Sequence, residues 1–249
     1  MRRRDSGRVA VFGATAEIGR WAAHAFARRG YDVIVAARDV PEAERVASDL
    51  SLRHDVRAEV VPFDARDDAS QAEAARRATA DGRLAGAVLA FGALGDHPRA
   101  ARDAAHARDV LEVNFTGAVV LLTHLAPYFA ARGAGFIAAV GSVAGDRGRQ
   151  SNYVYGAAKG GLAVYLQGLR NALAPVGVDV ITVKSGFVDT AMTYGRPGVF
   201  LAAHPRDVGE AVARAVERRR WVTYTPWFWR YVMLAIGAIP EGVFRRTKL

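Results

Sequence analysis

Short apolar runs alternate with longer amphipathic segments along almost the whole of this 249-residue chain. Parallel strands need crossovers of helical length, so the alternation predicts an α/β fold with a doubly wound parallel sheet of about seven strands. We expect helices on both faces of the sheet and a single domain over residues 1–249. The predicted strands are residues 8–12, 32–37, 57–63, 85–91, 135–141, 178–184 and 221–224, and the predicted helices are residues 18–29, 41–53, 67–80, 99–130, 152–174 and 206–219.

The first predicted strand leads into a turn bounded by Gly13 and Gly19. Gly13 would allow a tight turn, and Gly19 would allow close packing of the following helix, whose N-terminal N–H groups attract phosphate. The turn is therefore a candidate dinucleotide cradle. The fingerprint G-x-G-x-x-G is absent, however, and Glu17 stands where a third glycine often lies, so an ordinary strand–helix turn explains these residues equally well.

The second predicted strand ends in Arg38, which is followed by Asp39. An acidic residue at such a strand end binds the ribose 2′-hydroxyl of NAD, whereas an arginine suits the 2′-phosphate of NADP. Arg38 therefore favours NADPH as the cofactor, and Asp39 leaves NADH as the alternative. A solvated arginine without a ligand is the competing interpretation, because arginine is abundant in this chain.

Tyr155 and Lys159 stand four residues apart in a predicted helix, with Ser142 thirteen positions upstream. Residues at this spacing share a helix face, and an ammonium beside a phenol should lower the pKa of the phenol. Tyr155 could then exchange a proton near neutral pH. Only three of the 34 basic residues are lysines, which suggests that a compact ammonium is needed at position 159, although a surface pair on a helix is also possible.

Together these residues resemble the short-chain dehydrogenase/reductase family, whose fold is a Rossmann-type sheet. The resemblance implies that Tyr155 is the general acid, that Ser142 stabilises the developing alkoxide, and that Lys159 tunes Tyr155 and holds the nicotinamide ribose. Asn114 would complete the catalytic set by orienting a water molecule. The cofactor contacts implied by the resemblance are Gly13, Thr15, Glu17, Ile18, Gly19, Arg38, Asp64, Ala65, Gly92, Tyr155, Lys159, Val188 and Thr190.

Two segments depart from the family pattern in addition to Glu17. Ala90-Phe91-Gly92 replaces the usual Asn-Ala-Gly after the fourth strand, and Lys184-Ser185-Gly186 replaces the usual Pro-Gly after the sixth. The supporting role of the missing asparagine is therefore lost or altered.

Residues 90–96, 144–147 and 231–246 are also similar to decaprenylphosphoryl-2-keto-ribose reductases. That narrower similarity implies NAD(P)H-dependent reduction of a lipid-linked 2-ketosugar in cell wall biogenesis, with a flavin-dependent oxidase as the partner that makes the ketone. One alternative is a reductase of another small-molecule ketone, such as a polyketide, steroid or xenobiotic carbonyl. The other is a non-catalytic nucleotide-binding regulator, against which the complete set of four catalytic residues argues.

Composition narrows the remaining classes of function. The chain has no cysteine, and its six histidines show no metal-binding spacing, so we expect neither disulfides nor a metal site. The formal net charge of +9 suits phosphorylated ligands, but the arginines are scattered, and we expect no nucleic-acid partner. The first strand follows a short basic segment without an apolar leader, which predicts a cytoplasmic protein.

Residues 226–249 form an aromatic and basic C-terminal tail that includes Trp227, Trp229 and Tyr231. Its apolar run is far shorter than the ~20 residues that span a bilayer. We therefore consider two interpretations, which are peripheral contact with a membrane and burial against the core or against a second subunit of a homodimer or homotetramer. Residues 193–205, rich in proline and glycine, are predicted to form a mobile lid over the substrate.

Overall fold

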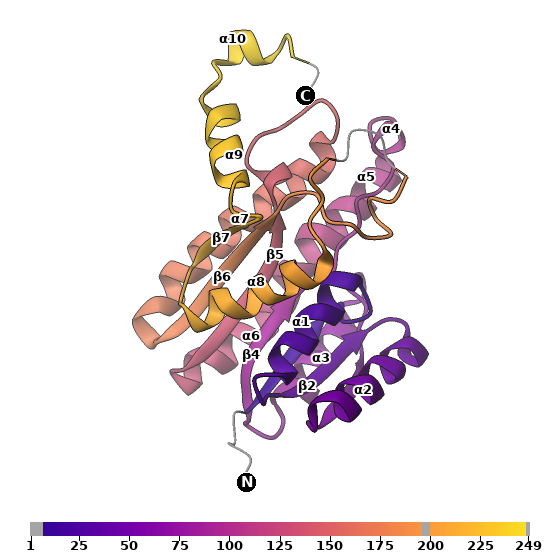
Figure 1. Cartoon of the computed structure of the whole chain (residues 1–249), viewed down its shortest axis with the longest axis vertical. Helices are drawn as coiled ribbons and strands as arrows, with labels where there is room; N and C mark the ends of the chain where they lie inside the picture. The colour runs from indigo at the N-terminus through magenta and orange to yellow at the C-terminus, as the bar shows by residue number, and fades with distance from the viewer. Residues whose placement is uncertain (1–6, 196–199, 248–249) are drawn as a thin grey trace.

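The computed structural model describes residues 7–195 and 200–247 (Figure 1). Its sheet has the strand order β3-β2-β1-β4-β5-β6-β7, and all neighbouring strands are parallel. The predicted doubly wound parallel sheet is therefore confirmed. The strands are β1 (Arg8–Phe12), β2 (Asp32–Ala37), β3 (Ala58–Pro62), β4 (Leu84–Leu89), β5 (Gly135–Ser142), β6 (Val178–Ser185) and β7 (Val222–Thr225).

Helices cover both faces of this sheet (Figure 1). One face packs against α1, α2 and α8, and the other packs against α3, α6 and α7. The helices are α1 (Glu17–Ala27), α2 (Val40–His54), α3 (Asp68–Thr79), α4 (His97–Ala100), α5 (Ala104–Leu111), α6 (Gly117–Arg132), α7 (Tyr153–Leu173), α8 (Pro205–Glu217), α9 (Trp229–Ala238) and α10 (Glu241–Phe244).

The alternation of side chains along β1 explains why both faces are filled. Val9 and Val11 belong to the core under α1, α2 and α8, whereas Ala10 and Phe12 belong to the core under α3, α6 and α7. Successive side chains of a strand point to opposite faces, so a strand that is buried on both sides must be apolar throughout. That is why residues 9–12 of β1 form a continuous apolar run.

The prediction of one helix over residues 99–130 was wrong. Asp103 accepts hydrogen bonds from the N–H groups of Ala105 (2.9 Å) and His106 (3.2 Å) and so starts α5 as a separate helix. A π-helical segment, Glu112–Thr116, then lies between α5 and α6. Hydrophobic periodicity could not reveal these interruptions, because the apolar pattern continues through them.

The stretch Ala104–Arg132 is helical throughout and is long and apolar enough, by length and composition alone, to cross a bilayer. The large apolar side chains of α6 nevertheless fill the protein core. Leu121, Leu125 and Phe129 have no exposed surface. Core packing therefore accounts for the apolar character of this part of the stretch.

Helices α9 and α10 extend beyond the sheet at the end of the molecule opposite the start of β1 (Figure 1). They lie beside the carboxyl ends of β5 and β6. One face of α9 packs through Trp229 and Met233 against Val143, while Tyr231 and Leu234 on the other face are exposed. The tail is thus attached to its own chain by one side and leaves an apolar side uncovered. Residues 196–199 of the predicted lid lie outside the described residues, and Ala203 pairs with Val188 in an isolated β-bridge.

Candidate active site

The loops that carry most of the candidate residues leave the sheet at the carboxyl ends of β1, β4, β5 and β6. Phe12 pairs with Leu89, and Ser142 pairs with Ser185, so these strands end side by side. The strand order reverses between β1 and β4, and ligands of open α/β sheets bind outside the carboxyl ends at such a reversal. The structure therefore places the predicted residues along one edge.

Ser142, Tyr155 and Lys159 come together at the junction of β5 and α7. Ser142 is the last residue of β5 and forms a hydrogen bond with the Tyr155 hydroxyl. Lys159 lies one turn after Tyr155 in α7, and its Nζ is 6.0 Å from the centroid of the Tyr155 ring. The buried Lys159 donates a hydrogen bond of 3.2 Å to the carbonyl oxygen of Val140. The side chains of Ser142, Tyr155 and Lys159, which were predicted to act together, therefore lie close to one another.

Glycines allow α7 to approach this junction closely, and sequence reasoning missed them. A Cβ atom on Gly145 would lie 2.6 Å from the backbone nitrogen of Gly160, and one on Gly156 would lie 2.9 Å from the carbonyl oxygen of Ala144. Real Cβ atoms do not approach backbone so closely, so larger residues here would push α7 away from Ser142. The recurrence of glycine at positions 145, 156 and 160 around Tyr155 is the sequence pattern that could have predicted this close packing.

Asn114 lies beside Lys159 across Gly92. A Cβ atom on Gly92 would be 2.9 Å from Asn114 Oδ1 and 3.4 Å from Lys159 Nζ. The Asn114 side chain donates to the carbonyl oxygens of Ala93 (2.6 Å) and Val110 (2.8 Å) and accepts from the Ala93 N–H (3.2 Å). Asn114 therefore clamps the loop after β4 from within the π-helical segment, a feature that is frequent at functional sites.

The pKa values at this junction differ from the expectation drawn from spacing alone. Burial raises the pKa of the Tyr155 phenol to about 12, and the hydrogen bond with Ser142 acts in the opposite direction. Burial lowers the pKa of Lys159 to about 8. The expected lowering of the Tyr155 pKa by Lys159 is thus not observed, because removal from water disfavours the charged forms of both groups and the Lys159 ammonium is directed to Val140.

The turn after β1 has the geometry of a phosphate cradle. Gly13 has a φ of +84°, and a Cβ atom on it would lie 2.6 Å from the backbone nitrogen of Phe91. A Cβ atom on Gly19 would lie 2.2 Å from the Gly13 carbonyl oxygen, so the helix can pack on the turn only with glycine here. The cap residue Ala16 offers no side-chain hydrogen bond to the N-terminus of α1. The first N–H groups of α1 therefore retain capacity for a phosphate.

The loop after β6 reaches back to this cradle through Glu17. Glu17 Oε1 accepts a hydrogen bond of 2.8 Å from the N–H of Ala191. Ile18 packs against a small cluster that contains Val188, and the hydroxyl of Thr190 hydrogen-bonds weakly to the Val188 carbonyl oxygen at 3.4 Å. The structure thus brings Glu17, Ile18, Val188 and Thr190 into one group. Thr15 lies in the same turn, and its carbonyl oxygen faces Arg20 at 3.4 Å.

The remaining predicted cofactor residues lie at the ends of β2 and β3. Arg38 is exposed, whereas the carboxylate of Asp39 caps α2 by accepting from the Glu42 N–H at 3.0 Å. Asp64 Oδ1 accepts from the Arg66 N–H at 3.0 Å, which orders the loop after β3. The carbonyl oxygen of Ala65 accepts from the buried amide of Gln71 at 2.9 Å. Asp39 is therefore engaged within the protein, whereas the Arg38 side chain forms no hydrogen bond or ion pair with residues 7–195 or 200–247.

The sequence did not predict that the aromatic tail is helical, and α9 forms a wall beside the site. Trp229 packs edge-to-face on Phe187, with ring centroids 5.8 Å apart, directly after the sixth strand. Arg147 fixes the far end of α9 to the segment between Ser142 and Tyr155. Its guanidinium donates to the carbonyl oxygens of Ile236, Gly237 and Ile239 at 2.7–2.9 Å and to Glu241 at 3.0 Å, and it stacks on Phe244 at 3.9 Å.

Lys184, one of the departures from the family pattern, has a partner within the protein. It forms an ion pair with Asp146 Oδ1, and the hydroxyl of Tyr224 donates to Asp146 Oδ2 at 3.0 Å. Burial acts to lower the pKa of Lys184, but Asp146 outweighs it, and the pKa is raised. Lys184 therefore anchors the loop after β5 to the end of β6.

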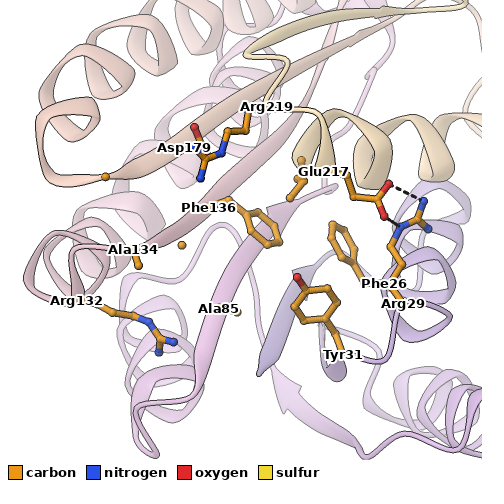
Figure 2. Close-up of a pocket in the computed structure, with 13 residues that line it drawn as sticks. Phe26, Arg29, Tyr31, Ala85, Arg132, Ala134, Phe136, Asp179, Glu217 and Arg219 are labelled. Carbon is orange, nitrogen blue, oxygen red and sulfur yellow. Dashed lines mark hydrogen bonds and ion pairs between the residues drawn. The ribbon is translucent and has the colours of Figure 1, made fainter. Parts of the chain in front are cut away.

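A hollow of about 350 Å³ lies at the opposite edge of the sheet (Figure 2). It is lined at the amino ends of β4, β5 and β6 by Ala85, Phe136 and Asp179. Four of its charged side chains form two ion pairs, since Arg29 contacts Glu217 at 2.7 Å and Arg219 contacts Asp179 at 3.3 Å. A fifth, Arg132, donates to the carbonyl oxygen of Gly82 at 2.6 Å. This hollow is far along the strands from Ser142 and does not belong to the candidate active site. Over residues 7–195 and 200–247 no cluster of His, Asp or Glu is arranged to hold a metal ion.

Comparison with known proteins agrees with this geometry. The family model for short chain dehydrogenases matches residues 8–197. An uncharacterized oxidoreductase of Mycobacterium tuberculosis is 37% identical over 239 residues, which is 96% of each chain. A short-chain dehydrogenase from Sphingobium yanoikuyae, solved in complex with NADPH, has a TM-score of 0.83 at 26% identity and covers 98% of this chain and 96% of its own.

A bulky-bulky ketone specific alcohol dehydrogenase from Comamonas testosteroni has a TM-score of 0.76 at 25% identity and covers 94% of this chain and 96% of its own. The matches thus extend over nearly the whole chain and include structures solved with a nicotinamide cofactor. The chain belongs to the short-chain dehydrogenase/reductase family and is an oxidoreductase that uses a nicotinamide cofactor.

Proposed function

We propose that this protein reduces a ketone to an alcohol with NADPH and that Tyr155 donates the proton. The observation that supports this most directly is the hydrogen bond between Ser142 and Tyr155, with Lys159 one turn further along the same helix. This group stands at the same edge of the sheet as the glycine turn and the free N-terminus of α1. A proton donor and a nucleotide cradle are thus adjacent.

Bound in that cradle, NADPH would supply the hydride that adds to the ketone carbon. The Ser142 and Tyr155 hydroxyls would hold the ketone oxygen and stabilise the negative charge that develops on it. Tyr155 then transfers its phenolic proton to this oxygen, which yields the alcohol and leaves a phenolate. Although burial raises the pKa of Tyr155 to about 12, an alkoxide is a stronger base than a phenolate, so the transfer remains favourable.

Lys159 and Asn114 would support this step in different ways. The Lys159 ammonium, within reach of the Tyr155 ring, stabilises the phenolate after proton transfer. It also stands next to Gly92 in the position to meet ribose hydroxyls of the cofactor. Asn114 holds the loop after β4 in place through Ala93 and thereby keeps Gly92 against Lys159. We also propose that Asn114 orients a water molecule, as the family resemblance implies.

Cofactor preference follows from the end of β2. Arg38 is exposed at that strand end, and the neighbouring carboxylate of Asp39 is occupied by the cap of α2. A guanidinium recognises the 2′-phosphate of NADPH by charge-assisted hydrogen bonds. An acidic group that already caps a helix is less available to the 2′-hydroxyl of NADH. We therefore favour NADPH, with NADH as the second cofactor.

The substrate would carry a large apolar group. Trp227, just before α9, and Leu234, on α9, leave 72% and 70% of their surface exposed. Trp229 of the same helix borders the site. A ketone with a long apolar substituent could lie along this face. The bulky-bulky ketone specificity named for the Comamonas testosteroni enzyme fits such a wall. Our first candidate is a lipid-linked 2-ketosugar of the decaprenylphosphoryl-2-keto-ribose type, made by a flavin-dependent oxidase, and the second is a polyketide, steroid or xenobiotic ketone.

The proposal is tested first on Tyr155. Tyr155→Phe keeps the ring volume and removes the proton donor, so turnover should fall by at least the ~10²–10⁴-fold that general acid catalysis contributes. NADPH binding, followed by quenching of intrinsic fluorescence, should be retained. A Tyr153→Phe variant is the matched control, because Tyr153 is exposed two positions earlier and contacts His97 edge-to-face. Near-normal turnover of Tyr155→Phe would refute the proposed role.

The substrate is tested by a screen with NADPH. A polyprenyl-phosphate 2-ketosugar should give a higher kcat/KM than steroid or aromatic ketones, because only the former combines a sugar ketone with a long apolar group. A steroid or polyketide that surpasses it would shift the proposal to the second candidate. If the protein reduces none of these ketones, the proposal that it is a ketone reductase is overturned.

The uncovered side of α9 has two proposed partners. Tyr231 and Leu234 are exposed beside Arg230, a combination that suits either a membrane surface with anionic headgroups or a second subunit. Sedimentation with anionic liposomes at low and at physiological salt would support the membrane, and a concentration-dependent dimer or tetramer in ultracentrifugation would support the subunit interface. Leu234→Glu should weaken the membrane contact or the subunit contact, whichever exists. Leu52→Glu makes the same change at an exposed leucine of α2 and should weaken neither.

A further inference from the structure

Arg149 is partly buried, and its side chain has no ion-pair partner among residues 7–195 and 200–247. It lies between Ser142 and Tyr155 in the sequence, and its carbonyl oxygen accepts from the Asn152 N–H at 3.2 Å just before α7 begins. Its Nε is buried and unpaired, and its guanidinium makes no hydrogen bond or ion pair within residues 7–195 and 200–247. An arginine in such a setting normally has acceptors, because leaving a buried charge unpaired is costly.

The charges around Arg149 do not balance. Arg147 is paired with Glu241 at 3.0 Å, and Lys184 is paired with Asp146. Three cations therefore share two carboxylates, and both oxygens of Asp146 are already engaged, by Lys184 and by the hydroxyl of Tyr224. Burial lowers the pKa of Arg149, and the attraction of Asp146 only partly offsets this. Among the described residues, Arg149 thus lacks a carboxylate partner of its own.

Arg170 shows how the same fold satisfies an arginine whose role is structural. It is also partly buried, but its guanidinium donates to the carbonyl oxygens of Val180 (2.7 Å) and Trp221 (3.0 Å) and to the hydroxyl of Thr182 (3.0 Å). Arg149 has no such set of acceptors. The side-chain oxygen of Asn152, three residues later, is also buried and unpaired.

We propose that Arg149 forms a subsite for a phosphate ester carried by the ketone substrate. The planar guanidinium matches phosphate oxygens with two parallel hydrogen bonds, and the negative charge of the ester neutralises the third cation of this group. The unpaired Asn152 oxygen accepts a hydrogen bond from a hydroxyl group of the same ligand. The inference rests on the proposed function, because it assumes that the ketone is reduced at Tyr155 while its phosphate is held at Arg149.

The test compares ligands that share one alkyl chain. Octyl phosphate, octanol and inorganic phosphate are used as inhibitors of the NADPH-dependent reduction of 2-octanone by wild-type protein, Arg149→Gln, Arg149→Lys and a control. The control is Arg76→Gln, which changes an exposed arginine of α3. Octyl phosphate should compete with the ketone and not with NADPH. Its inhibition constant relative to that of octanol should rise about 10- to 100-fold in Arg149→Gln, as expected for loss of charge-assisted hydrogen bonds. Arg149→Lys should be intermediate, and Arg76→Gln should resemble the wild type.

A phosphate subsite and a purely structural Arg149 predict different results. Equal inhibition of wild type and Arg149→Gln by octyl phosphate, or competition with NADPH in place of the ketone, would overturn the proposal. Comparable binding of inorganic phosphate and octyl phosphate at Arg149 would support an anion subsite without recognition of the alkyl group. The melting temperature of Arg149→Gln should be unchanged or higher, because an unpaired buried charge is removed, whereas a marked decrease would indicate a structural role and refute the subsite.

Failure of the proposed function is distinguishable from failure of the subsite. If the wild-type protein does not reduce 2-octanone, calorimetric titration of octyl phosphate into the NADPH-loaded protein measures the subsite directly. Binding that is lost in Arg149→Gln would then support the subsite while ketone reduction fails. Equal binding by both proteins would overturn the subsite.

Discussion

A Cβ atom on Gly186 would lie 1.9 Å from the indole Nε1 of Trp229, so the first residue of α9 can pack on the loop after β6 only because residue 186 is glycine. This contact joins the C-terminal tail to the edge of the sheet where the catalytic residues lie. The position of α9 is thus coupled to the geometry of the site.

Gly186→Ala should therefore displace Trp229 and weaken the attachment of α9. We expect a lower melting temperature, a changed tryptophan emission and a decreased kcat/KM. Gly237→Ala provides the matched control, because a Cβ atom at that position of α9 would meet nothing within 4 Å and alanine favours a helix over glycine. Equal behaviour of the two variants would show that the Gly186 contact has no importance.

The reduction rate should depend on pH through Lys159. Burial lowers the pKa of Lys159 to about 8, so its ammonium is present below that pH and is lost above it. The phenolate left on Tyr155 then loses its stabilising charge, and kcat/KM for reduction should decrease as the pH rises through about 8. A profile of kcat/KM from pH 6 to 10 checks this. A constant rate up to pH 10 would indicate that the charge of Lys159 is not needed.

Arg38→Ala should change the cofactor preference. Removal of a charge-assisted contact with the 2′-phosphate, worth about 1.5–3 kcal/mol, should reduce kcat/KM with NADPH about 10- to 100-fold and affect NADH little. Arg53→Ala is the control, because Arg53 lies on α2 and pairs with Asp49 one helical turn away. An unchanged ratio of the two cofactors would leave Arg38 as a solvated residue.

Glu17 should influence both ligands. Its carboxylate lies at the N-terminus of α1, where the pyrophosphate is proposed to bind, and accepts from the Ala191 N–H. Glu17→Gln keeps an acceptor and removes the repulsion, so NADPH should bind about 2- to 10-fold more tightly. Glu17→Ala should instead raise the KM for the ketone, because the Ala191 contact is lost. Glu44→Gln, an exposed residue of α2, should change neither constant.

The sheet could be predicted from the sequence because its strands are buried on both faces. Each predicted strand lies within two residues of the observed one. The single helix over 99–130 could not be corrected, because Asp103 and the π-helical segment interrupt it without a change in apolar pattern. Helix α9 was missed since it is stabilised by packing of Trp229 and Met233 on Val143, a contact far apart in the chain.

In the site, too, features set by neighbouring residues could be predicted, whereas features set by residues distant in sequence could not. The four-residue spacing correctly placed Tyr155 and Lys159 on one face of α7. The predicted lowering of the Tyr155 pKa was wrong, because burial raises this pKa and the burial depends on elements distant in sequence. Lys184, which looked only like a departure from the family, proved to be paired with Asp146.

The hold of Arg147 on the last turn of α9 makes the C-terminal segment inseparable from the loop that carries Ser142. Exchange of this segment alone between related enzymes would leave Arg147 facing carbonyl groups in the wrong positions. A functional chimera would have to transplant residues 142–155 together with residues 226–247. Natural divergence in substrate choice faces the same constraint, so these two stretches should change in concert along the lineage.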